Sequence, residues 1–192
     1  MKPYELLEIL RVAEKLKCNT RHCYTSNGRH ESVAEHSWRI ALMAMLIAPE
    51  FPEANMDKVI RMCLIHDLGE AFTGDIPTFD KTAADSEKED ALFDRWVQTL
   101  PEETKQEFSA LLAEMSALET VEAKIYKALD KMEAVIQHNE SDISTWLPLE
   151  YDLQLRYGAE NVKFSPWFTS LKEEIDNWTR RKIEESKCKN AG

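Results

Sequence analysis

The chain has 192 residues, of which 43% are hydrophobic, and its 24 Lys and Arg against 35 Asp and Glu give a formal net charge of -11. This acidic balance argues against a groove for polymeric nucleic acid, because phosphate backbones are bound by basic surfaces. The longest apolar run, residues 40–48, is too short for a membrane span, and the lack of CxxC spacing and of a signal-peptide core predicts a reduced, cytoplasmic protein.

The first half of the chain predicts three helices. Apolar residues at helical spacing mark one that ends near Cys18, and a polar loop follows. Ser32 opens the second with a capping box, in which its hydroxyl accepts from the amide of Glu35 while the Glu35 carboxylate accepts from the Ser32 amide. The third begins near Asn55, contains a His-Asp pair deep inside it, and ends before Gly74.

The second half of the chain is also mainly helical. Amphipathic patterns predict helices over residues 84–100, 102–118 and 120–140. Ser165 and Pro166 give a cap and a first turn to a last helix that runs to about Lys187. The one clear period-2 stretch, residues 151–157, has the alternation typical of a strand. The fold class predicted from these patterns is all-α, in a single domain over residues 1–192.

Three of these helices carry candidate metal ligands. They are His36 on the second helix, the pair His66 and Asp67 on the third, and Asp130 on the helix over 120–140. Taken singly, a helical histidine is more often a hydrogen-bonded or surface residue than a ligand. Together, two imidazoles and two carboxylates form a mixed nitrogen and oxygen set that suits Mn, Fe, Co, Ni or Zn, and Mg is a further candidate.

The arrangement of these residues resembles the HD-domain superfamily of metal-dependent phosphohydrolases, whose pattern is a histidine, a later His-Asp pair and a distant aspartate. The matching segments are ESVAEHSWRIA, CLIHDLGEAFTGDIP and KALDKMEAVIQ. Within that superfamily, GEAFTGDIP is similar to the short 5'-deoxynucleotidases, which act on deoxyribonucleoside 5'-monophosphates. The resemblance implies homodimers and a single HD-domain bundle of about seven to eight helices, with a core over about 21–140 and C-terminal helices over 141–187.

The same resemblance implies a phosphate-binding arginine, and Arg21 matches it by position, 15 residues before His36. A guanidinium can hold two phosphate oxygens in a bidentate fork. An aromatic residue often accompanies that arginine in the family, and His22 follows it here. The expected substrate-binding residues are Arg21, His22, His36, Asp67, Asp75 and Asp130.

Glu70 and Asp75 are the candidates for proton transfer, together with Arg21 as the third catalytic residue. Glu70 lies one turn after His66 on the predicted helix, so both face one side, and Asp75 follows in the turn made by Gly74. They can orient the attacking water and protonate the departing sugar oxygen, or hold a second ion. Without a metal site beside them, Glu70 would be an ordinary helix residue and Asp75 a turn former.

Four other polar residues are weaker candidates. Glu133 lies nearly one turn after Asp130. Two positions suit it equally from the sequence, one in which it supports a metal ligand and one in which it faces solvent. Lys81 and Lys88 are candidates to attract an anionic substrate, and His138 is expected at the surface.

Three functions fit this sequence. The favoured one is a metal-dependent phosphomonoester hydrolase that removes the 5'-phosphate from deoxyribonucleoside 5'-monophosphates, a preference that comes from the resemblance alone. The second is an HD phosphohydrolase for a deoxynucleoside triphosphate or an alarmone, which the short chain disfavours. The third is a non-catalytic helical protein that binds a metal or a nucleotide; a closed four-ligand shell would favour it.

Large apolar residues are frequent in the C-terminal third of the chain. They suit a homodimer interface, since aromatic residues are enriched at such sites, or they complete the core of the chain itself. They are Trp146, Leu149, Tyr151, Leu153, Leu155, Tyr157, Trp167, Phe168 and Trp178.

Overall fold

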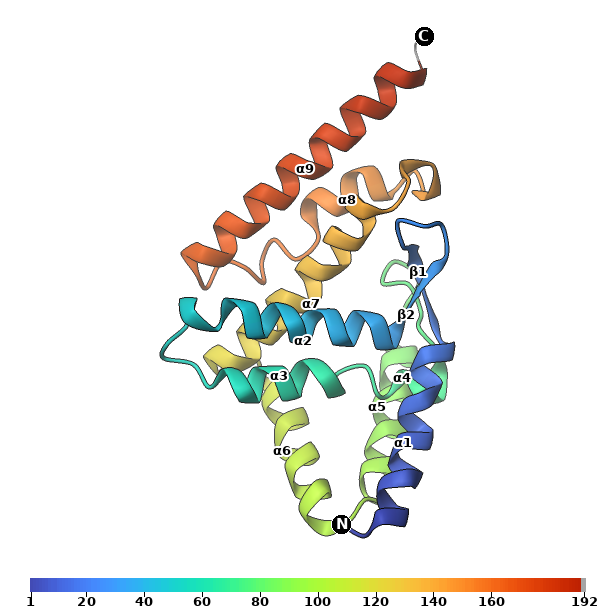
Figure 1. Cartoon of the computed structure of the whole chain (residues 1–192), viewed down its shortest axis with the longest axis vertical. Helices are drawn as coiled ribbons and strands as arrows, with labels where there is room; N and C mark the ends of the chain where they lie inside the picture. The colour runs from blue at the N-terminus through green and yellow to red at the C-terminus, as the bar shows by residue number, and fades with distance from the viewer. Residues whose placement is uncertain (191–192) are drawn as a thin grey trace.

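The computed structural model describes residues 1–190 as a helical bundle with one small hairpin (Figure 1). In chain order, the elements are α1 (Pro3–Cys18), β1 (Thr20–Tyr24), β2 (His30–Ser32), α2 (Val33–Ile47), the 3-10 turn η1 (Ala48–Glu50), α3 (Met56–Ile65), α4 (Glu70–Thr73), α5 (Ala83–Val97), α6 (Glu102–Ala117), α7 (Val121–Glu140), the 3-10 turn η2 (Ile143–Thr145), α8 (Glu150–Arg156) and α9 (Pro166–Asn190). The predicted all-α fold class is confirmed. None of the helices in the described part of the chain has the length and hydropathy to span a bilayer.

α2, α3 and α7 form the centre of the bundle. α2 packs along α3, and both contact α7 (Figure 1). Each contributes a fully buried aliphatic side chain, Ile40, Met62 and Leu129 respectively. Burial of one such side chain stabilises the fold by about 1.5–3 kcal/mol. This packing fixes the three helices relative to one another, and the candidate metal ligands lie on them or directly after them.

The capping box at the start of α2 is confirmed. Ser32 Oγ accepts from the Glu35 amide at 3.2 Å, and the Ser32 amide donates to Glu35 Oε2 at 2.9 Å. A hydrogen bond from Arg29 and those from Ser32 lower the pKa of Glu35 to about 2. The cap sets the first turn of α2, and thereby directs His36 into the bundle.

The polar loop expected after α1 is an antiparallel hairpin of β1 and β2 instead. Gly28, with φ of 84°, provides the left-handed residue of its turn. The side chain of Gln137 on α7 donates to the carbonyl of Tyr24 at 2.7 Å, so the hairpin docks on the central helix. The polar residues of the hairpin are typical of a solvent-exposed loop, but some of them, such as Glu31, are buried here and face other residues.

The expectation that the His-Asp pair lies deep inside a helix is wrong. α3 ends at Ile65 and α4 begins at Glu70. Between them, the amide of Leu68 donates to the Ile65 carbonyl at 3.1 Å and that of Glu70 to the Asp67 carbonyl at 3.0 Å. These bonds span three residues and not four, which winds the backbone more tightly. His66 and Asp67 therefore lie at a break between two helices.

The alternating stretch over 151–157 forms α8 and not a strand. An ion pair between Asp152 and Arg156, one turn apart, supports the helical conformation. α8 is followed by Gly158 at φ of 71°, where a Cβ would lie 2.6 Å from Met132 Cε on α7. The absence of a side chain at this position lets the chain after α8 pass close to α7.

The apolar residues of the C-terminal third belong in part to the core of the chain itself, where Phe168 is buried and Tyr157 and Trp167 pack against the core. Trp146 is 6% exposed and Phe168 is fully buried. Of the nine residues considered for a dimer interface, Leu149 is the one that is largely exposed among the described residues. Large exposed apolar side chains occur instead on α1 and α2, and Trp38 and Met45 are examples.

Candidate metal centre and active site

The four predicted metal ligands converge at the centre of the bundle. Nε2 of His66 lies 2.9 Å from Oδ2 of Asp67, and Nε2 of His36 lies 3.4 Å from Oδ1 of Asp130. The cross distances are 3.8 Å from His36 Nε2 to Asp67 Oδ2 and 3.9 Å from His66 Nε2 to Asp130 Oδ1. Ligands that bind one divalent ion at about 2.0–2.2 Å lie at comparable separations from one another.

The two histidines are oriented as metal ligands. His66 donates from Nδ1 to the Cys63 carbonyl at 2.9 Å, and His36 makes a short hydrogen bond from Nδ1 to Glu133 Oε2. Both Nε2 atoms are buried, and within residues 1–190 neither has an aligned hydrogen-bond partner. Such bonds at Nδ1 fix the ring so that a lone pair on Nε2 can bind a metal. The donor set therefore fits a divalent ion.

Asp130 is held from the side opposite the histidines. Its Oδ2 accepts from Lys127 Nζ at 2.9 Å, and Lys131 Nζ lies 3.4 Å away. Burial disfavours the charged carboxylate, but the two lysines and His36 outweigh it and hold the pKa of Asp130 well below its usual range. Oδ1 thus remains directed at the histidines, and the lysines stand beside the metal centre.

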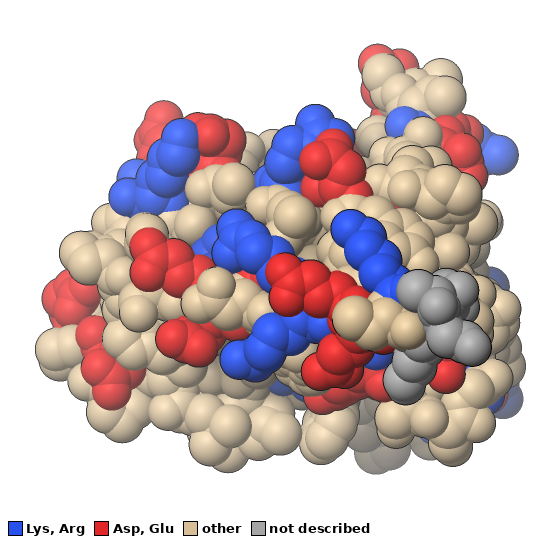
Figure 2. Space-filling view, turned by 90° about the horizontal axis from the view of Figure 1, so that it is seen from above, with Lys and Arg blue, Asp and Glu red and all other residues tan. Residues whose placement is uncertain are grey.

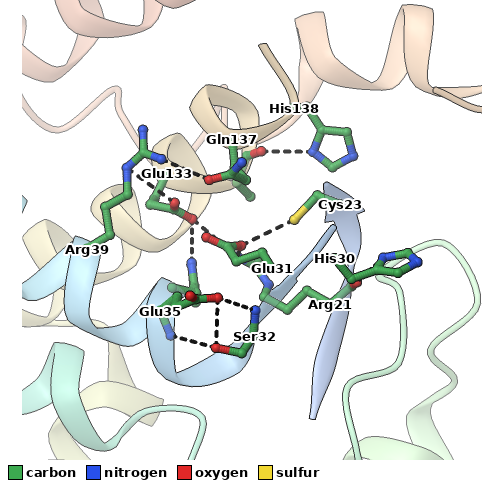
Figure 3. A network of polar contacts seen from close by, with 12 residues as sticks. Arg21, Cys23, His30, Glu31, Ser32, Glu35, Arg39, Glu133, Gln137 and His138 are labelled. Carbon is green, nitrogen blue, oxygen red and sulfur yellow. Dashed lines mark hydrogen bonds and ion pairs between the residues drawn. The ribbon is translucent and has the colours of Figure 1, made fainter. Parts of the chain in front are cut away.

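Glu133 links the metal centre to the predicted phosphate-binding arginine. Figure 3 shows the polar network around Glu133, with Arg21, Glu31 and Arg39 labelled. Its fully buried carboxylate contacts His36 through Oε2, and the same oxygen accepts from Arg21 at 3.2 Å. Arg21 also donates to Glu31 Oε2 at 2.9 Å, and Glu31 accepts the thiol hydrogen of Cys23 at 3.3 Å. Burial lowers the pKa of Arg21, but the surrounding acids outweigh this effect and raise it well above its usual value.

A polar cavity opens beside the metal centre. Arg21 is held at one end of its guanidinium and remains partly exposed toward this cavity. The other charged residues lining it are Asp67, Glu70, Asp75, Lys81, Lys127, Asp130 and Lys131. Lys88, the other lysine considered from sequence, does not line it.

Glu70 and Asp75 both face this cavity. The side chain of Glu70 is buried, and its Oε2 has no hydrogen-bond partner in the described part of the chain. Burial, together with the nearby charges of Asp67 and Asp75, raises the pKa of Glu70 to about 10. Burial likewise raises the pKa of Asp75. Both carboxyl groups therefore retain protons to a higher pH than in water.

A second, more apolar pocket adjoins the polar cavity and shares four wall residues with it, Arg21, Asp75, Thr78 and Tyr157. His22 lies in this pocket with the edge of its ring against Phe79, at 5.4 Å between ring centroids. His138, which was expected at the surface, is 14% exposed and lies in the same wall. The expectation fails because His22 of the hairpin and Glu150 of α8 lie against His138.

The HD domain family model matches residues 13–172, which include all four candidate metal ligands. The chain belongs to the HD domain family. Among curated HD relatives, the 5'-deoxynucleotidase HDDC2 of Homo sapiens is 34% identical over 139 residues, covering 70% of this chain and 67% of that protein. The Mus musculus protein of the same name is 33% identical over 176 residues, covering 89% and 86%. A crystal structure titled as a predicted metal-dependent phosphohydrolase, from Magnetospirillum magnetotacticum MS-1, has a TM-score of 0.78 at 30% identity and covers 93% of both chains.

Sequence reasoning missed several polar residues of this HD domain site. Lys127 precedes Asp130 by three residues, which places both on one helical face. This spacing could have identified Lys127 as a partner of Asp130. Glu31 and Glu150 carry no such signal, because hairpin docking and the position of α8 bring them to the site. Lys131 follows Asp130 directly in the chain, and its approach to the Asp130 carboxylate becomes visible only in the structure.

Proposed function

We propose that this HD domain protein is a metal-dependent 5'-deoxynucleotidase that hydrolyses deoxyribonucleoside 5'-monophosphates to deoxynucleoside and phosphate. The observation that carries the proposal is the joining of a four-ligand metal centre and Arg21 at one polar cavity, with a more apolar pocket next to it. A phosphate at the metal centre could thus extend its nucleoside into the adjoining pocket. The names of the curated relatives support this substrate class.

His36, His66, Asp67 and Asp130 would hold the divalent ion. When bound, the ion would polarise a phosphoryl oxygen and lower the pKa of a water, so that hydroxide is available to attack phosphorus near neutral pH. Co, Mn, Mg, Fe, Ni and Zn all remain candidates, because the mixed donor set admits each of them. Glu70 has an unpartnered oxygen in the cavity, and with Asp75 it is the place where a second ion would bind.

Arg21 binds the phosphate in this proposal. Its fixed NH1 leaves the remaining guanidinium donors for two phosphate oxygens, which holds the phosphate in one orientation. His22 contacts the nucleoside in the adjoining pocket, with Phe79 beside it. His36, Asp67 and Asp130 border the phosphate from the metal side.

The two carboxyl groups have different roles in this proposal. Glu70 lines only the polar cavity, so it orients the attacking water on the phosphate side. Asp75 lines both spaces, so it lies where the phosphate meets the sugar and can protonate the departing 5'-oxygen. Its raised pKa favours that role, since a donor must carry a proton near the working pH.

A second candidate substrate is a nucleotide with more phosphates, such as a deoxynucleoside triphosphate or an alarmone. Lys81, Lys127 and Lys131 all line the polar cavity and would suit additional phosphates. Each is already paired with a carboxylate, however, which reduces its attraction for a further anion. A purely binding role is disfavoured by the carboxyl groups of Glu70 and Asp75, which face the cavity beside the metal centre.

The protein is further proposed to be a cytoplasmic homodimer. Its four cysteines are all free thiols, as in a reducing compartment. Trp38 and Met45 lie seven residues apart on one face of α2 and are 62% and 56% exposed, which makes this face the candidate interface. Light scattering at micromolar concentrations should give twice the chain mass, and Trp38→Glu should give the monomer mass. A monomer mass for the unaltered protein would contradict this assembly.

The function is tested by a phosphate-release screen against deoxy- and ribonucleoside monophosphates, triphosphates and cyclic nucleotides, with each candidate metal. We expect release from deoxyribonucleoside 5'-monophosphates with at least one metal, and none from Asp67→Ala. Faster release from triphosphates would favour the second candidate. No release from any nucleotide with any metal would refute both hydrolase proposals.

A further inference from the structure

A second cluster of two imidazoles and one carboxylate lies outside the HD metal ligands. His22 of β1, His138 of α7 and Glu150 of α8 bring their side chains together in the wall of the nucleoside pocket. Nε2 of His138 is 2.8 Å from Oε1 of Glu150, and Nε2 of His22 is 3.3 Å from the same oxygen. All three atoms lie within 4.8 Å of one another. Glu150 is 1% exposed, so this carboxylate is enclosed with its histidine partners.

Two of the three residues are oriented as metal ligands are. His138 Nδ1 contacts the Ala134 carbonyl at 2.9 Å, as His66 Nδ1 contacts the Cys63 carbonyl at the HD centre. Oε2 of Glu150 accepts from the Leu147 amide at 2.7 Å, which leaves Oε1 for the histidines. Backbone contacts of this kind fix a ligand before the metal arrives.

The contacts of His138 also show what the cluster lacks. Nδ1 faces a carbonyl oxygen and Nε2 faces a carboxylate oxygen, and both are acceptors only. A neutral imidazole has one N–H, so it can satisfy one of these contacts and opposes the other with a lone pair. The arrangement needs a second proton on the ring, a proton on Oε1 of Glu150, or a cation between Nε2 and Oε1.

We propose that His22, His138 and Glu150 form a binding site for a divalent transition ion, with Zn²⁺ as the ion best suited to two imidazoles and a carboxylate. Ligands of tetrahedral zinc at about 2.0–2.1 Å lie roughly 3.3–3.4 Å from one another. The 3.3 Å between His22 and Glu150 already matches that spacing. The 2.8 Å between His138 and Glu150 needs to lengthen by about half an ångström, which a small rotation of either side chain provides.

The bound ion would connect three elements, since its ligands come from β1, α7 and α8. β1 carries Arg21 next to His22, so the ion ties the phosphate-binding strand to α7 and α8. Arg21 and Asp75 also line the pocket, and Arg21 is the nearest fixed cation in that wall. Its charge is already compensated by Glu31 and Glu133, which reduces its repulsion of a metal ion.

The test is a count of bound zinc by elemental analysis after dialysis against a buffered free Zn²⁺ concentration. His138→Gln and Glu150→Gln should each hold one zinc per chain fewer than the unaltered protein. His30 is an exposed histidine outside both clusters, so His30→Gln is the matched control and should hold the same number. In an Asp67→Ala background, which weakens the HD centre, the zinc lost on adding His138→Gln should still be one per chain.

A zinc anomalous difference map of the unaltered protein tests the site without any substitution. We expect a peak about 2.0–2.1 Å from Nε2 of His22 and His138, separate from the HD centre. No peak there at millimolar Zn²⁺, or equal zinc counts in the unaltered protein and both variants, would overturn the proposal. Neither measurement depends on turnover, so a failure of the proposed nucleotidase activity is seen separately in the phosphate-release screen.

Discussion

Replacement of Glu133 by glutamine tests whether one buried carboxylate supports both the metal centre and the phosphate-binding arginine. Oε2 of Glu133 contacts His36 Nδ1 and Arg21 NH1, and Oε1 lies 3.6 Å from Nε of Arg39. Glu133→Gln keeps the size of the side chain and removes its charge. The glutamine amide also adds two N–H donors to a place where every neighbour named here is a donor.

The expected effects follow from these contacts. Removal of one partner from a buried charged pair destabilises a protein by about 3–5 kcal/mol, and the retained amide oxygen should keep the loss near the lower end of that range. Because loss of a partner behind a metal-bound histidine typically weakens metal affinity about 10–100-fold, we expect a loss of that size for Glu133→Gln. Arg21 loses one of its two carboxylate partners, so KM for the nucleotide should rise as well.

Glu140→Gln is the matched control. Glu140 lies on the same helix and pairs with the same Arg39, at 2.6 and 2.8 Å, but it has no contact with the metal ligands among the described residues. Metal affinity is measured by competition with a chelator, and unfolding by urea with and without metal. If Glu133→Gln binds metal and unfolds as Glu140→Gln does, the proposed link between His36 and Arg21 is refuted.

Three further predictions concern the remaining charged groups. Arg21→Ala should keep the metal but lose about 2–4 kcal/mol of transition-state stabilisation, measured as kcat/KM, and Arg21→Lys should restore little of it. Asp75→Asn should keep the metal while turnover falls by about 100-fold or more, whereas Asp67→Ala should lose the metal, and elemental analysis beside turnover separates the two. In the metal-free protein, the raised pKa of Glu70 means that its contribution to stability is complete at low pH and is lost as pH rises toward about 10. In urea unfolding, the free energy of unfolding of Glu70→Gln should therefore fall less steeply with rising pH than that of the unaltered protein, by up to about 1.4 kcal/mol per pH unit. An equal slope in both proteins would show that Glu70 is not the group responsible for the decline.

The features that follow local rules could be predicted from the sequence. The capping box at Ser32 and the amphipathic helix that carries Asp130 depend on spacings within one segment, and both form as predicted. The four candidate metal ligands could be found because their residue types and order are themselves informative. Their meeting in space follows from the packing of α2 and α3 against α7.

The features that depend on tertiary contacts could not be predicted. The hairpin is polar along its length, and its docking is decided by partners on α7 such as Gln137, more than a hundred residues away. Glu31 reads as a surface residue until Arg21 and Cys23 are placed beside it. The break after Ile65 could not be predicted because an apolar helical pattern continues across it. The backbone hydrogen bonds there span three residues and not four.

The site also explains how so acidic a chain could bind an anionic substrate. The cations at the cavity are each paired with a carboxylate, Arg21 with Glu31 and Glu133, and Lys127 with Asp130. Such pairing fixes where the positive groups point, but it also cancels much of their charge toward a phosphate. The cations can therefore orient the phosphate more effectively than they can attract it. A divalent ion held by the proposed ligands would supply the missing positive charge, which is the physical reason that binding and hydrolysis should both depend on the metal.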